Sequence, residues 1–121
     1  MGRILIIEDD AQIRKMLRRV LEDAGYEVEE APDGLEGIEL YRKKPADLVI
    51  TDIVMPEKEG LETIIELRRE FQDVKIIAIS GGGRIRPEPY LQVAEGFGVE
   101  HVFTKPFDIR DLLAAVVKLV E

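Results

Sequence analysis

The chain alternates short apolar runs with longer segments in which hydrophobic residues recur at helical spacing. Five runs rich in β-branched residues predict strands, at residues 4–7, 26–30, 48–51, 74–79 and 99–104. The third and fourth runs are almost continuously apolar, which is typical of strands that are covered on both faces. The pattern therefore predicts a sheet with its central strands buried between two layers.

Helical spacing marks five further segments. In residues 12–24, the apolar side chains of Ile13, Leu17 and Leu21 share one stripe, and Gly25 ends the helix. The others are residues 34–43, a segment around 61–67, one from about residue 87 or 89 to 96–98, and one that begins at 108–111. Strands alternating with helices predict a parallel sheet with right-handed crossovers. Five such units in 121 residues predict one domain, residues 1–121, with the flavodoxin-like doubly wound fold, strand order 2-1-3-4-5 and five helices.

Reactive side chains follow four of the five predicted strands. Glu8 and Asp9 end the first run, Asp52 the third, Ser80 the fourth, and Lys105 follows the fifth. In the predicted strand order these four strands lie side by side, and binding sites of such sheets lie at the carboxyl ends of the strands. We therefore expect carboxylates, a hydroxyl and an ammonium group in one crevice.

Charge and composition narrow the chemistry of this crevice. Asp and Glu number 25 against 17 Lys and Arg, for a net charge of −8, which argues against nonspecific nucleic-acid or membrane binding. The chain has no cysteine, so thiolate metal sites and disulfides are excluded. Glu8, Asp9 and Asp52 are hard oxygen donors that suit Mg²⁺, and a cation would offset their repulsion. Asp10 is predicted to cap the first helix instead.

These residues, in this order, give the chain a resemblance to the receiver domain of two-component response regulators, the chemotaxis-regulator family. The resemblance covers essentially the whole length of the chain. Glu8 and Asp9 match the acidic pair of that family, Asp52 its phospho-acceptor, Ser80 its Ser/Thr position and Lys105-Pro106 its Lys-Pro pair, and residues 55–60 (MPEKEG) match its Met-Pro-x-x-x-Gly loop.

The resemblance implies that Asp9, Asp52 and the backbone carbonyl of Val54 bind Mg²⁺ directly, and that Glu8 acts through water. It implies that a histidine kinase or histidine phosphotransfer protein donates a phosphoryl group to Asp52, with Ser80 and Lys105 contacting that group. The face formed by the fourth helix, fifth strand and last helix would then change its affinity for a downstream protein. The chain is expected to be a cytoplasmic signalling module that catalyses only its own phosphorylation and dephosphorylation, without contacting nucleic acid or membrane.

One position departs from the family pattern. Receivers of this family commonly carry an aromatic residue three positions before the lysine, and its movement reports phosphorylation. Here Val102 stands at that position and Phe103 follows it. Because side chains alternate along a strand, Phe103 is expected to face the other way, so ordering of the loop at residues 80–87 would have to replace the usual switch. His101, the one histidine, is expected at the surface.

Two other functions compete with this interpretation. An Mg²⁺-dependent phosphohydrolase with an Asp nucleophile normally requires a second carboxylate, as acid/base, two residues after the nucleophile. Val54 stands at that position here. A flavin-binding electron carrier would want small or hydroxyl residues after the first strand, where three acids would repel its phosphate. No output domain follows Val120-Glu121, so the sequence is compatible with a free-standing regulator, a relay intermediate or a receiver cut from a longer protein.

Overall fold

The computed structural model describes residues 2–53, 60–80, 96, 98–104 and 107–120. Its centre is a five-stranded parallel sheet with the order β2-β1-β3-β4-β5, as predicted. The strands are β1 (Arg3–Ile7), β2 (Glu27–Ala31), β3 (Leu48–Asp52), β4 (Ile76–Ser80) and β5 (His101–Thr104).

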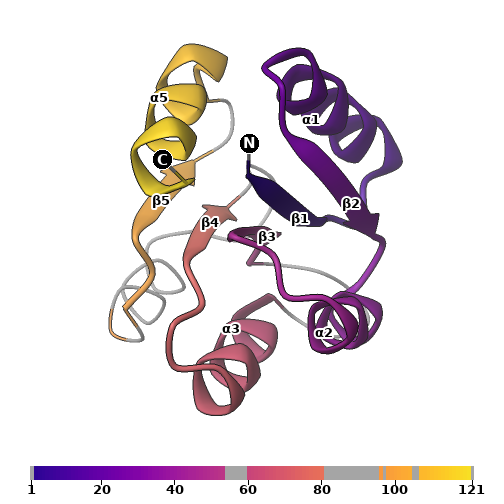
Figure 1. Cartoon of the computed structure of the whole chain (residues 1–121), viewed down its shortest axis with the longest axis vertical. Helices are drawn as coiled ribbons and strands as arrows, with labels where there is room; N and C mark the ends of the chain where they lie inside the picture. The colour runs from indigo at the N-terminus through magenta and orange to yellow at the C-terminus, as the bar shows by residue number, and fades with distance from the viewer. Residues whose placement is uncertain (1, 54–59, 81–95, 97, 105–106, 121) are drawn as a thin grey trace.

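Four helices lie in the described part of the chain and cover both faces of the sheet. They are α1 (Ala11–Asp23), α2 (Gly34–Lys43), α3 (Gly60–Glu70) and α5 (Ile109–Val120). Helices α1 and α5 lie on one side of the sheet, and α2 and α3 lie on the other (Figure 1). The predicted fourth helix falls almost entirely outside the described residues, so the prediction of five helices is confirmed only for these four.

Two strands begin two residues later than predicted, whereas the starts of the other three agree to within one residue. Strand β4 begins at Ile76 instead of residue 74, and β5 begins at His101 instead of residue 99. Val74 is only 2% exposed and Val99 packs against the core, although both precede the paired residues. An apolar residue can therefore be buried before strand pairing begins, which the hydrophobic pattern alone cannot reveal.

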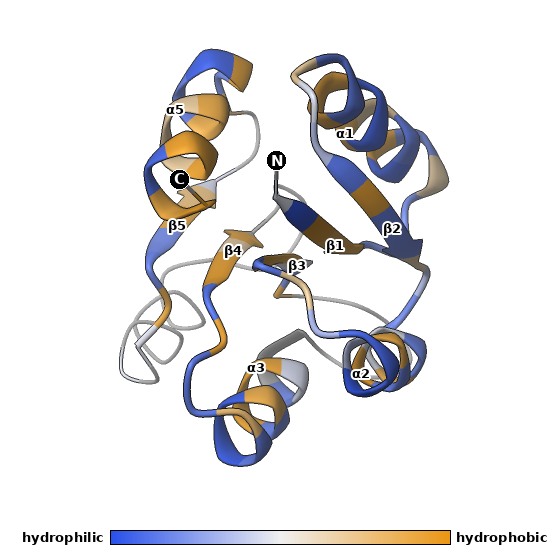
Figure 2. Cartoon of the chain, viewed as in Figure 1, coloured by the Kyte–Doolittle hydropathy of each residue, from blue (hydrophilic) through white to orange (hydrophobic). Residues whose placement is uncertain are grey.

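The core consists of two apolar clusters separated by the sheet. Along β1, Leu5 and Ile7 face the α2–α3 side, whereas Ile4 and Ile6 face the α1–α5 side. All five residues of β3 are buried. The hydropathy colouring shows the apolar faces of the helices turned toward the sheet (Figure 2). Because apolar side chains fill both faces, the carboxyl ends of the strands remain the natural place for polar chemistry.

Helix α2 approaches β1 unusually closely at a glycine. A Cβ atom added to Gly37 would lie 2.4 Å from Cδ1 and 2.6 Å from Cγ1 of Ile7. Real Cβ contacts are essentially never this short, so a larger residue at position 37 would have to displace Ile7 or the helix. Ile7 directly precedes Glu8. This close packing therefore helps to fix the position of the first acidic residue after β1.

Within the described ranges, the structure contains no helix with both the length and the apolar character needed to cross a membrane.

Candidate functional site

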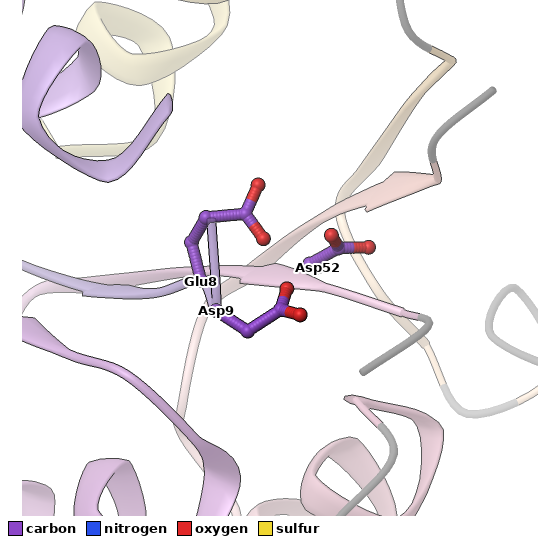
Figure 3. Close-up of side chains that lie close together, drawn as sticks. All are labelled: Glu8, Asp9 and Asp52. Carbon is purple, nitrogen blue, oxygen red and sulfur yellow. The ribbon is translucent and has the colours of Figure 1, made fainter. Parts of the chain in front are cut away.

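Three acidic side chains gather at the carboxyl edge of the sheet. Glu8 follows β1 and Asp52 ends β3, the neighbouring strand, while Asp9 comes from the loop that leads to α1. One carboxylate oxygen from each residue lies within 4.8 Å of the other two. Figure 3 shows the three carboxylates turned toward a common space. The structure thus brings together the acidic residues that the sequence predicted would meet.

The three carboxylates differ in their exposure to solvent. Glu8 is 3% exposed and Asp52 is 6% exposed, whereas Asp9 is exposed. Burial disfavours the charged form of a carboxyl group, so two buried carboxylates near a third require compensating positive charge or hydrogen bonds. A divalent cation at this edge would supply such charge.

Backbone hydrogen bonds fix the two strand ends that carry the cluster. The N–H group of Glu8 donates to the carbonyl of Ala31 at 3.1 Å, which continues the pairing of β1 with β2. On the other strand, the N–H group of Ile53 donates to the carbonyl of Ile79 at 2.8 Å. Backbone pairing therefore continues past the last residue of β1 and of β3. It fixes the backbone that carries the side chains of Glu8 and Asp52.

Asp10, the third acid in the run, has a separate role. Its side chain accepts hydrogen bonds from the N–H groups of Gln12 at 2.9 Å and Ile13 at 3.2 Å, with Asp10 in extended conformation. This is the geometry of an N-terminal helix cap, as predicted. The carboxylate of Asp10 is thus committed to α1, and the cluster takes only the two acids before it.

Two arginines of α1 bind Glu30 of β2, and one of them, Arg14, also contacts the acidic site. Arg14 Nε donates to Glu30 Oε1 at 2.9 Å, and Arg18 Nη1 donates to Glu30 Oε2 at 2.9 Å. These hydrogen bonds, that from Arg18 first, lower the pKa of Glu30 below its ordinary value. Arg14 also donates from Nη1 to the main-chain carbonyl of Glu8 at 2.8 Å. Arg14 was not predicted from the sequence as a site residue. The feature that could have indicated it is its position one turn into the helix that follows the acidic run.

The remaining predicted site residues are described only in part. Ser80 ends β4 and pairs with Thr104, so its backbone lies at the same edge of the sheet as Asp52, one strand away. Val54, Lys105 and Pro106 lie outside the described residues, as do positions 55–59 of the Met-Pro-x-x-x-Gly motif. Gly60, the last residue of that motif, begins α3.

The departure at β5 takes the form that the sequence predicted. Val102 packs against the apolar cluster on the α2–α3 side, and Phe103 packs against the cluster on the α1–α5 side. The ring of Phe103 therefore does not occupy the side on which Val102 lies. The expectation that His101 lies at the surface holds only in part, because it is partly buried and stacks on Phe103 with ring centroids 6.1 Å apart. His101 lines a shallow pocket together with Ala114 and Lys118 of α5, which accounts for its partial burial.

The donor set fits a hard divalent cation. Mg²⁺ prefers oxygen ligands and is held in proteins by one or two carboxylates, together with water or phosphate oxygens. Glu8, Asp9 and Asp52 offer three carboxylates at one open edge, with Asp9 exposed to solvent. These residues could therefore hold such an ion and leave coordination positions for water.

Comparisons with known proteins agree with this geometry. A sequence model of the response regulator receiver domain matches residues 4–117. The chain is 35% identical over 120 residues to the response regulator receiver protein CpdR of Brucella abortus, covering 99% of this chain and 98% of CpdR. It is also 35% identical to RpaA of Synechocystis, named a DNA-binding dual master transcriptional regulator, over 96% of this chain but 48% of RpaA.

Solved structures show the same fold. The chemotaxis protein CheY4 of Vibrio cholerae superposes with a TM-score of 0.85 at 31% identity, over 98% of each chain. The chain therefore spans nearly the whole of CpdR and CheY4 but about half of RpaA. Because the family match covers almost the whole chain, including both strands that end in the acidic cluster, the protein belongs to the response regulator receiver domain family, the signalling domain of two-component systems.

Proposed function

We propose that the chain is a phosphorylation-switched signalling module in which Asp52 accepts a phosphoryl group in an Mg²⁺-dependent reaction. The observation that carries this proposal is the placement of Asp52. Asp52 ends a fully buried strand and is 6% exposed, and one of its carboxylate oxygens lies within 4.8 Å of carboxylate oxygens of Glu8 and Asp9. An acceptor in this position is screened from most solvent and adjoins a set of cation ligands.

The proposed donor is a phosphohistidine of a histidine kinase or a histidine phosphotransfer protein. An Oδ atom of Asp52 attacks phosphorus, the phosphorus–nitrogen bond breaks, and the imidazole nitrogen of the donor keeps the electron pair. Bound Mg²⁺ supplies neutralisation of the negative charge on the phosphoryl group. Asp9 and Asp52 would hold the ion directly together with the backbone carbonyl of Val54, and Glu8 would act through water.

Ser80 and Lys105 are proposed to contact the transferred group. A hydroxyl donor on one phosphoryl oxygen and an ammonium group on another would stabilise charge that carboxylates alone would repel. Two backbone features support these roles: Ser80 ends the strand beside β3, and it pairs with Thr104, the residue before Lys105. Ser80 therefore stands at the same edge of the sheet as Asp52, and Lys105 directly follows the residue that pairs with Ser80.

The output of the module is proposed to be a change in partner affinity. The surface formed by the predicted fourth helix, β5 and α5 would bind a downstream protein differently when Asp52 is phosphorylated. Membership of a signalling family and the adjacency of β5 to β4, which ends in Ser80, support this assignment. Direct contact with nucleic acid is not part of the proposal, because the match to RpaA covers only about half of that protein.

Phosphorylation by a small donor tests the proposal. Acetyl phosphate with Mg²⁺ should add one phosphoryl group to the wild-type chain, measured by intact mass spectrometry, and the Asp52→Asn variant should remain unmodified. Asp73→Asn is the matched control, since Asp73 is an exposed aspartate that precedes β4, near the opposite end of that strand from its carboxyl end. Full labelling of Asp52→Asn would overturn the assignment. Rapid turnover of p-nitrophenyl phosphate by the wild type would favour the phosphohydrolase instead.

A further inference from the structure

We propose that Arg14 is a positioning residue for the cation site, because it fixes the backbone that carries Glu8 and Asp9. This inference rests on the proposed Mg²⁺-dependent function and adds a residue to it. Arg14 touches none of the three carboxylates in the contacts described above. Its effect would pass through the main chain of Glu8.

One guanidinium group ties together three elements of the fold. Arg14 belongs to α1, its Nη1 donates to the main-chain oxygen of Glu8 after β1 at 2.8 Å, and its Nε donates to Glu30 of β2 at 2.9 Å. The side chain of Arg14 is 16% exposed and that of Glu30 is 22% exposed, so water competes little for these bonds. Hydrogen bonds with a charged partner are among the stronger ones in proteins.

The contact acts at the peptide group that joins the two acids. The carbonyl of Glu8 belongs to the same peptide plane as the N–H group of Asp9, so orienting one orients the other. The N–H group of Glu8 is held in turn by the carbonyl of Ala31, the residue after Glu30. Both peptide groups of Glu8 are thus fixed against α1 and β2. The acidic pair is therefore held in place before any cation binds.

Charge alone predicts the opposite effect of Arg14. A cationic side chain near an Mg²⁺ site repels the ion, so its removal should strengthen binding. In this structure, however, Glu30 accepts hydrogen bonds from both Arg14 and Arg18, and Arg18 Nε also donates to Glu22 Oε2 at 3.2 Å. Two arginines and two glutamates give this network no net charge. The guanidinium of Arg14 can therefore orient the Glu8 backbone with little repulsion of the cation. Positioning predicts that removal of Arg14 weakens Mg²⁺ binding, whereas charge repulsion predicts that it strengthens binding.

The test measures Mg²⁺ affinity by isothermal titration calorimetry on the intact chain. Arg14→Met should weaken Mg²⁺ binding by roughly threefold to tenfold, at or below the lower end of the range seen when groups that orient metal ligands are removed. Arg14→Lys keeps the charge but cannot reproduce the fork of donors, so it should bind with intermediate affinity. Arg18→Met is the matched control: it removes the same charge from the same ion-pair network without a contact to Glu8, and its affinity should stay within about twofold of wild type or rise.

A second measurement reports the peptide group next to the one that Arg14 contacts, namely the N–H of Glu8 that donates to Ala31. In metal-free buffer, the amide hydrogen of Glu8 should exchange faster in Arg14→Met than in wild type and Arg18→Met, measured by NMR. Affinity in Arg14→Met equal to or tighter than wild type, or unchanged protection of the Glu8 amide, would overturn the positioning role.

Two further outcomes decide the remaining cases. If Arg14→Met does not fold by circular dichroism, Arg14→Lys decides, and an affinity equal to wild type overturns the proposal. A wild-type chain that binds no Mg²⁺ would overturn the proposed function as well. Normal wild-type binding without an Arg14 effect overturns only this inference.

Discussion

Glu8 and Asp52 stand one residue beyond the paired residues Ile7 and Thr51 on two neighbouring parallel strands. Both residues are almost fully buried, at 3% and 6% exposure, and the carboxylates of both contribute to the cluster that Asp9 completes from the solvent side. Such an arrangement favours cation binding at the expense of stability without a cation. Removing one of these charges should therefore have opposite effects on the two properties.

Asp9→Ala should weaken Mg²⁺ binding strongly and raise stability in metal-free buffer. The variant loses a ligand and also relieves repulsion among three nearby carboxylates. We expect the free energy of unfolding in EDTA to rise by about 0.5–1 kcal/mol, the size of a moderate interaction between partly exposed charges. Urea unfolding followed by circular dichroism measures this change, since the chain contains no tryptophan.

Asp10→Asn is the control for this experiment. It removes one negative charge from the adjacent position, and asparagine caps helices about as well as aspartate, so α1 should keep its N-terminal cap. Its Mg²⁺ affinity should remain close to that of wild type. An Asp9→Ala protein that binds Mg²⁺ as the wild type does would contradict the proposed cluster.

The Glu30 ion pairs should make stability depend on pH in a defined direction. Hydrogen bonds from Arg18 and Arg14 lower the pKa of Glu30 below 4.5 in the folded chain, whereas the unfolded chain should titrate near 4.5. The stabilisation is therefore fully present above about pH 4.5 and is lost as the pH falls through the lower, folded pKa. Glu30→Gln should cost about 1 kcal/mol at pH 7, and this difference should shrink in acid.

Urea unfolding of wild type and Glu30→Gln across this pH range, in EDTA, checks the expectation. Glu70→Gln offers a comparison, because Arg42 lowers the pKa of Glu70 by the same kind of hydrogen bond in a more exposed pair. The Glu70 variant should show a smaller effect that salt weakens further. A Glu30→Gln difference that does not change with pH would show that the ion pairs do not stabilise the folded state.

Gly37→Ala should destabilise the protein although alanine favours helices. The added Cβ would meet the side chain of Ile7 at 2.4 Å, and overpacking of this kind costs about 1–3 kcal/mol, which exceeds the gain of about 1 kcal/mol in helix propensity. Ile7→Ala removes both Cδ1 and Cγ1, the two closest atoms, so Gly37→Ala should cost less in that background. Denaturant unfolding of the four proteins of this double-mutant cycle measures the coupling, and equal costs in both backgrounds would refute the close contact.

The lifetime of the phosphorylated state gives a prediction that rests on the sequence, since its two positions lie outside the described residues. In receivers, the side chains two residues after the phosphorylated Asp and two after the Ser/Thr flank the path of the hydrolytic water. Val54 and Gly82 cannot hydrogen-bond that water, so dephosphorylation should be slow. Val54→Asn combined with Gly82→Glu should accelerate phosphate release at nearly unchanged Mg²⁺ affinity. Equal release rates, measured side by side in excess Mg²⁺, would contradict this role.

The sequence by itself determined the order of strands and helices, the acids that follow β1 and the acid that ends β3. It could do so because burial on both faces forces near-continuous apolar runs, and because a polar residue after such a run must lie at the edge of the sheet. The capping role of Asp10 was also predictable, since it depends on residues only two and three positions away.

Only the tertiary structure decided how these residues are held. It buries Glu8 but leaves Asp9 exposed, joins Arg14 to the Glu8 carbonyl and to Glu30, and begins β5 at His101 instead of residue 99. Each feature depends on which backbone group of one element meets which side chain of another. Hydrophobic periodicity predicts that a face of a helix or strand is buried. It does not predict which residue of another element contacts that face.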